Sequence, residues 1–61
     1  MANITSKELT ALEDQIGMEQ TLVKKYQAMS EMCGDTQIKQ RLADFAQKHQ
    51  THYNTLMTFL Q

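Results

Sequence analysis

Three polar side chains with metal-binding chemistry, Glu19, His49 and His52, are spaced so that two helices could bring them together. His49 and His52 stand three residues apart, which places both imidazoles on one face of a helix. Neutral imidazole nitrogens and a carboxylate oxygen together suit zinc, iron, manganese, nickel or copper. A His-x-x-His pair alone is a weak metal signal, so the prediction depends on whether Glu19 lies opposite the pair.

Composition and capping residues predict an all-α chain. Proline is absent and glycine occurs only twice among the 61 residues, which is typical of helical proteins. Thr5 followed three residues later by Glu8 matches a capping box. We therefore expect a first helix that begins near residue 6 and continues to about residue 32.

A tight turn over residues 33–35 is expected to join this helix to a second one over about 36–60. Gly34 tolerates the left-handed backbone conformation that commonly ends a helix. Asp35 can then accept hydrogen bonds from the free N–H groups of the next helix. The chain would be a single domain, residues 1–61, folded as an antiparallel helical hairpin.

Seam residues recur in both segments at alternating steps of three and four, which indicates a bundle core. The two seams are Leu9, Leu12, Ile16, Glu19, Val23, Tyr26, Ser30 and Cys33, and Ile38, Leu42, Phe45, His49, His52, Leu56 and Phe59. Across a tight antiparallel turn, residues lie opposite each other when their numbers have a constant sum, here 68, twice the number of Gly34. This sum pairs Glu19 with His49 and puts His52 near the same level.

A second apolar stripe beside the seam predicts a partner chain. The stripe comprises Met18, Leu22, Met29 and Met32, and Ala46, Tyr53, Met57 and Leu60. Two helices cannot bury so wide a face, and a domain of about 60 residues is marginal alone. We expect a homodimer that forms a four-helix bundle, with four histidines and two glutamates converging near its axis. Tyr53 is expected in the dimer core, where its hydroxyl could orient a ligand.

Charge and hydropathy argue against two classes of partner. Six Lys and Arg against seven Asp and Glu give a net charge of −1, so we expect no basic face for nucleic acid or an anionic membrane. No apolar run approaches the roughly 20 residues of a membrane span, so no membrane insertion is expected. The start MANITSKE lacks the features of a signal peptide, which predicts a cytoplasmic protein.

Nucleophilic catalysis by the single cysteine is also not expected. Cys33 lies at the turn end, about 24 Å along the helix axis from the level of His49, too far for a Cys/His pair. A small apolar seam residue is the simplest interpretation of Cys33, and an interchain disulfide is the alternative.

The site residues resemble those of the ferritin-like superfamily of metal-binding bundles. Its members supply a Glu from the first helix of each helical pair and a Glu-x-x-His from the second, and many place a Tyr seven residues after the first Glu. This chain has Glu19, Tyr26 and His49-x-x-His52. The resemblance implies that Glu19 and His52 are ligands in a ferritin-like four-helix bundle and that Tyr26 lies behind them.

One departure from the ferritin-like pattern changes the expected metal. His49 stands where the family has its bridging glutamate. We therefore expect a nitrogen-rich centre for one divalent ion, zinc or iron(II), in preference to a carboxylate-bridged di-iron pair. Any catalytic activity would be metal-dependent redox chemistry.

The same residues also allow two alternatives to a metal-binding protein. The segment 47–54 also resembles small spore-coat-F-like proteins of spore-forming bacteria, which implies the spore coat or another protein assembly as location and partner. Without a metal, Glu19 would form a charged hydrogen bond with His49, and the pair would act as a polar pin that fixes helix register.

Overall fold

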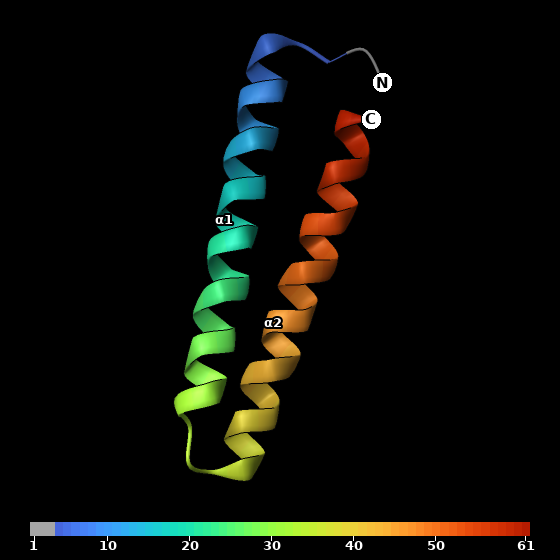
Figure 1. Ribbon diagram of the computed structural model, residues 1–61. Coiled ribbons are helices and arrows are strands. Elements are labelled where there is room, and N and C mark those ends of the chain that lie inside the picture. Colours follow the sequence, from blue (N-terminus) through green and yellow to red (C-terminus); the bar gives the residue numbers. More distant parts are fainter. Residues whose placement is uncertain (1–3) are drawn as a thin grey trace.

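The computed structural model describes residues 4–61 as two antiparallel helices of nearly equal length (Figure 1). α1 spans Ser6–Met32 and α2 spans Thr36–Met57, and one 3-10 turn, η1, continues over Thr58–Leu60. The hairpin is a thin rod whose Cα atoms extend 46 × 14 × 11 Å. The predicted helical hairpin is confirmed, and the last turn of the second predicted helix is tightened into η1.

Both helix starts are capped as the sequence predicts. The Thr5 hydroxyl accepts a hydrogen bond from the Glu8 backbone N–H at 3.1 Å, and the Glu8 carboxylate accepts one from the Thr5 backbone N–H at 2.9 Å. The Asp35 carboxylate accepts from the N–H groups of Gln37 and Ile38 at 2.9 and 3.0 Å. Two sets of otherwise unpaired N–H groups are thereby satisfied, which sets where each helix begins.

The turn between the helices differs from the expected glycine stop. Neither glycine has a positive φ in the described range, so the expected left-handed conformation of Gly34 is wrong. α1 ends at Met32 and is capped by Cys33, whose backbone is extended (φ −81°, ψ 127°) and whose N–H donates to the Ser30 carbonyl at 3.2 Å. The extended residue leads the chain directly to the Asp35 cap, so no left-handed residue is needed.

The space between the helices buries very few side chains. Val23 and Ala46 are the buried apolar residues of the described chain, and Glu19 and Ser30 are the buried polar ones. No described side chain is less than 2% exposed. A single hairpin therefore has contact between its helices along their length but lacks an enclosed core.

The apolar faces of α2 are rotated relative to the predicted pattern. Ala46, assigned to the second stripe, is 4% exposed, whereas the seam residues Ile38, Phe45 and Phe59 are 54, 42 and 52% exposed. Consecutive residues differ by about 100° around a helix, so Ala46 and Phe45 cannot both face α1. The short alanine side chain occupies the narrow space between the helices, and the phenylalanine ring lies at its edge.

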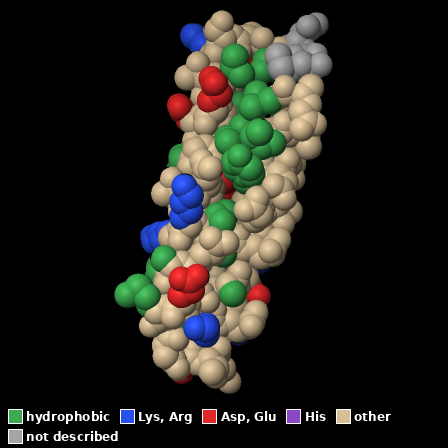
Figure 2. All heavy atoms as spheres, viewed as in Figure 1, with side chains coloured by type: hydrophobic (Ala, Val, Ile, Leu, Met, Phe, Trp, Pro, Cys, Tyr) green, Lys and Arg blue, Asp and Glu red, His purple; other side chains and the backbone are tan. Residues whose placement is uncertain are grey.

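One side of the hairpin presents a mixed apolar and amide surface. Figure 2 shows hydrophobic side chains gathered along the furrow between the first half of α1 and the last half of α2, and no histidine is visible on this side. Farther toward the turn, Gln27, Gln47 and Gln50 line a hollow of about 430 Å³.

Within the described residues, neither helix has the length and apolar character needed to cross a bilayer.

Candidate metal centre

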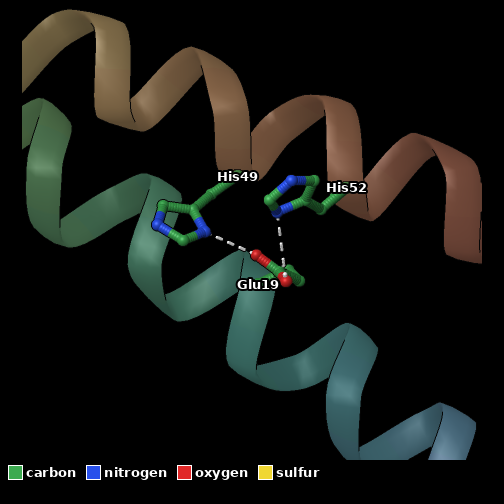
Figure 3. A group of neighbouring side chains, drawn as sticks. All are labelled: Glu19, His49 and His52. Atoms are coloured by element: carbon green, nitrogen blue, oxygen red, sulfur yellow. Dashed lines mark hydrogen bonds and ion pairs between the residues drawn. The ribbon is translucent and has the colours of Figure 1, made fainter.

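The candidate centre is built around Glu19 at the middle of α1. The Glu19 side chain is 9% exposed because it points across the hairpin toward α2. One carboxylate oxygen lies 2.6 Å from His49 Nδ1, and the other lies 3.5 Å from His52 Nδ1 (Figure 3). The residues predicted to meet at one level therefore do meet, and the Glu19 and His49 pair follows the sum of 68.

α2 supplies two imidazoles that turn the same ring nitrogen toward the carboxylate. His49 and His52 lie on adjacent turns, with ring centroids 5.6 Å apart and planes at 84°. Figure 3 shows both Nδ1 atoms directed at Glu19 from above. The His49 side chain is 24% exposed and that of His52 is 56% exposed. The group is thus closed at His49 and open to solvent at His52.

The spacing of the donor atoms is close to what one ion requires. One ligand atom from each residue can be chosen so that all three lie within 4.8 Å of one another. For bonds of about 2.1 Å, ligand atoms around a tetrahedral or octahedral ion are roughly 3.0–3.4 Å apart. His49 and His52 contact different oxygens of Glu19. Around one ion, the Glu19 to His49 contact must open by less than about 1 Å, and a separation as wide as 4.8 Å must close by about 1.4 Å.

The carboxylate is held in its ionised form. The hydrogen bond with His49 lowers the pKa of Glu19 from its ordinary value of 4.5, although burial acts in the opposite direction. A hydrogen bond from the Gln15 amide at 3.2 Å and the nearby charges of His52 and His49 lower it further. An ionised carboxylate can only accept, so the bridging proton belongs to His49 Nδ1. An ion bound at that nitrogen must displace this proton.

Tyr26 lies beside the group and contacts it through the face of its ring. The Tyr26 and His49 rings are stacked, with centroids 5.6 Å apart and planes at 7°. Phe45 packs edge-on against Tyr26 at the same centroid distance, and the Lys25 ammonium lies 5.6 Å from the Tyr26 centroid. The Tyr26 ring therefore lies parallel to the His49 imidazole. The role behind the ligands that the resemblance implies for Tyr26 stays a prediction.

Tyr53 occupies a different part of the hairpin from the candidate ligands. It lines a hollow of about 270 Å³ together with Gln20, Val23, Lys24, Gln27 and Gln50. None of the three candidate ligands lines that hollow. Its assignment as a residue that orients a ligand stays a prediction that depends on the dimer.

Two features near the centre were not anticipated from the sequence. Gln15 stands one helical turn before Glu19 and donates to its second oxygen, a contact that the i, i+4 spacing could have suggested. An open hollow of about 280 Å³, lined by Gln15, Glu19, His52, Thr55 and Leu56, leads to the group. A ligand from solvent can therefore reach the carboxylate on the His52 side.

No known protein or family was found with which the candidate centre can be compared. Comparison with protein-family models, with curated proteins and with solved structures found no match. The functional conclusion must therefore come from the residues of this chain.

Proposed function

We propose that this chain is a small metal-binding protein whose homodimer holds a divalent transition-metal ion, zinc or iron(II), with Glu19, His49 and His52 as ligands. One observation carries the proposal: the two oxygens of a single buried carboxylate face the Nδ1 atoms of two histidines from the neighbouring helix. A buried carboxylate is costly unless it is partnered, and a metal ion would bind it together with both imidazoles.

The donor set favours some ions over others. Two imidazole nitrogens and one carboxylate oxygen suit zinc and iron(II) better than magnesium or calcium, which prefer oxygen ligands. Three protein donors leave at least one coordination position for water or for a ligand from a second copy. In the dimer, four imidazoles and two carboxylates would surround the centre. Any reaction there would be metal-dependent redox chemistry in a ferritin-like bundle.

A second candidate function is a metal-free structural or assembly module, and a specific observation favours it. Every buried side-chain nitrogen and oxygen in the described part of the chain has a hydrogen-bond partner. Glu19 and His49 satisfy each other at 2.6 Å without an ion. In this alternative the pair is a polar pin that fixes how α1 and α2 align, and a spore-coat-like assembly is the corresponding role and location. The metal-binding candidate corresponds to a cytoplasmic protein.

Thermal unfolding with and without a chelator separates the two candidates. The proteins to compare are the wild type, purified without an affinity tag and analysed for metal, and the double variant His49→Leu/His52→Leu. A metal site predicts that the chelator lowers the melting temperature of the wild type only, because the bound ion stabilises the folded assembly alone. The single variant His52→Ala should lose the response to added zinc or iron(II). Gln50→Leu, which changes α2 outside the group, should keep it.

The opposite outcome is equally clear. If neither protein responds to the chelator and the double leucine variant is the more stable one, the three residues are a polar pin, because apolar replacement of an ion pair is commonly neutral or stabilising. The metal proposal would then be wrong.

A further inference from the structure

The hairpin exposes more surface than a protein of its mass should. A compact monomer of 7.1 kDa exposes about 4,100 Å², whereas this chain exposes 4770 Å². The difference, roughly 700 Å², approaches the roughly 800 Å² that each partner buries in a standard protein interface. The hairpin therefore leaves exposed an excess area that is close to one partner's share of a protein interface.

The exposed apolar residues identify which face that is. On α2, Ile38, Phe45 and Phe59 are 54, 42 and 52% exposed. They are spaced by seven and fourteen residues, and His52 completes the heptad stripe. Residues at heptad spacing lie on one side of a helix, so this stripe passes through the open side of the candidate metal centre.

α1 contributes the other half of the same face. Met18 and Met29 are 57 and 43% exposed and stand eleven residues apart, close to three full turns. The Tyr26 ring, which lies one turn from Met29, contacts the Phe45 ring. Apart from Met32 at the end of α1, the exposed large apolar residues of both helices therefore lie on one side. We name this side the Phe45 face: Met18, Met29, Ile38, Phe45, His52 and Phe59.

Charge is divided unequally between the two ends of the rod. The turn half, residues 20–48, has five Lys and Arg against three Asp and Glu, a net charge of +2. The open half, residues 4–19 and 49–61, has one Lys against four Asp and Glu, a net charge of −3. Two hairpins with their turns at the same end would place like charges together, whereas turns at opposite ends place the positive half of one beside the negative half of the other.

We infer that a second copy of this chain covers the Phe45 face, with its turn at the opposite end. This inference deepens the homodimer of the proposed function, because it assigns the face and the orientation. On α2 the assigned face differs from the predicted stripe, because Ala46 is buried between the helices and Tyr53 lines a hollow beside Gln27 on the other side. Glu19 stands thirteen residues from each end of α1. A two-fold axis across the rod at that level would overlap the hairpins along their whole length and bring the two Glu19, His49 and His52 groups face to face.

Sedimentation in the presence of a chelator tests the face. The wild type should be a dimer at micromolar concentration, and Phe45→Gln or Met18→Gln should weaken it by at least about tenfold. Ala43→Gln, which adds an amide to the hollow beside Gln27 on the other side, should leave the dimer intact. A monomeric wild type, or a dimer weakened as much by Ala43→Gln as by Phe45→Gln, overturns the assignment.

A distance measurement tests the orientation and needs no substitution. A nitroxide on Cys33, the only cysteine, reports the separation of the two turns by pulsed electron resonance. Turns at opposite ends predict a separation comparable to the 46 Å length of the rod, whereas turns at the same end predict roughly 20 Å, about two helix diameters. The short distance would overturn the orientation. If Phe45→Gln unfolds the chain, the measurement on the wild type still decides.

The chelator keeps this result separate from that of the proposed function. A protein that dimerises through the Phe45 face but binds neither zinc nor iron(II) contradicts the metal proposal and leaves the interface standing. A monomer that binds zinc contradicts the interface and leaves the metal ligands standing.

Discussion

Ser30 and Glu19 are two buried polar residues of α1 that solve the same problem in different ways. They are 8 and 7% exposed and stand eleven residues apart, so both face α2 from the same side of the helix. The Ser30 hydroxyl donates to the backbone carbonyl of Lys39 at 3.0 Å. The Glu19 carboxylate instead faces two imidazoles and the Gln15 amide.

The difference follows from what a helix can offer a buried group. Backbone carbonyls can accept a second hydrogen bond, so a hydroxyl is satisfied by almost any sequence on the opposite helix. The N–H groups within a helix are already used, so a buried carboxylate needs donors from side chains. Ser30 therefore places little demand on α2, whereas Glu19 requires residues such as His49 and His52. That requirement places a carboxylate and two imidazoles, a set of side chains that could hold a metal ion, at one level of this small hairpin.

Removing the carboxylate should have the largest effect on stability. Glu19→Ala leaves the buried side of His49 without its acceptor, and we expect a loss of about 1.5–3 kcal/mol in the free energy of unfolding. Urea unfolding at fixed protein concentration measures it. Glu13→Ala, an exposed position on the same helix, is the matched control and should change stability by less than about 0.5 kcal/mol. Equal losses in the two variants would contradict a special role for Glu19.

Acid should remove the same stabilisation without a mutation. The pKa of Glu19 is lowered in the folded chain, chiefly by the hydrogen bond with His49. A lowered folded pKa means that the stabilisation is complete above the unfolded value and is lost as pH falls through the folded value. The contribution of Glu19 should therefore be complete above the ordinary value of 4.5 and should be lost as pH falls below it.

Two controls make this pH profile informative. Glu8, whose pKa is also lowered by its bonds with Thr5, adds its own acid loss, so the difference between the wild type and Glu19→Gln is the quantity to measure. Ser30→Ala should retain the full acid transition because a hydroxyl does not titrate. With zinc present, a flat profile between about pH 7 and 5 favours the polar pin, since a metal site must compete with protons for the imidazoles.

The Ser30 hydroxyl should contribute less to the free energy of unfolding than the Glu19 carboxylate does. Ser30→Ala removes one hydrogen bond to the Lys39 carbonyl, which already takes part in the α2 backbone, so neither partner is left unsatisfied. We expect a loss of about 0.5–1 kcal/mol by urea unfolding. The response of the protein to chelator should be unchanged. A loss as large as that of Glu19→Ala would mean that the two groups are not energetically different.

Much of the hairpin could be predicted because its signals are local. Thr5, Glu8 and Asp35 act on N–H groups within three residues of themselves, so their caps depend little on the rest of the fold. The level at which Glu19 meets His49 follows from the rise per residue and the position of the turn. Local spacing and helix geometry were sufficient for these features.

The rotation of each helix about its own axis could not be predicted in the same way. Whether Ala46 or Phe45 faces α1 depends on how closely the helices approach, which is a property of both surfaces together. The acceptor of Ser30 is a backbone carbonyl, which carries no sequence signal. Gly34 tolerates several backbone conformations, so the geometry of the turn is decided by the extended Cys33 before it.

The smallest expected effect is that of Tyr26→Phe, because Tyr26 supports the Glu19 group without bonding to the carboxylate. Because its contact with His49 is between ring faces at 5.6 Å, Tyr26→Phe keeps the contact and should cost less than about 0.5 kcal/mol. Tyr26→Leu removes the aromatic pairs with His49 and Phe45, each worth about 0.5–1.5 kcal/mol. The leucine variant should also bind zinc several-fold more weakly, because the His49 ring is free to rotate away from Glu19. Zinc titration of both variants checks this: equal affinities would show that Glu19 alone orients His49.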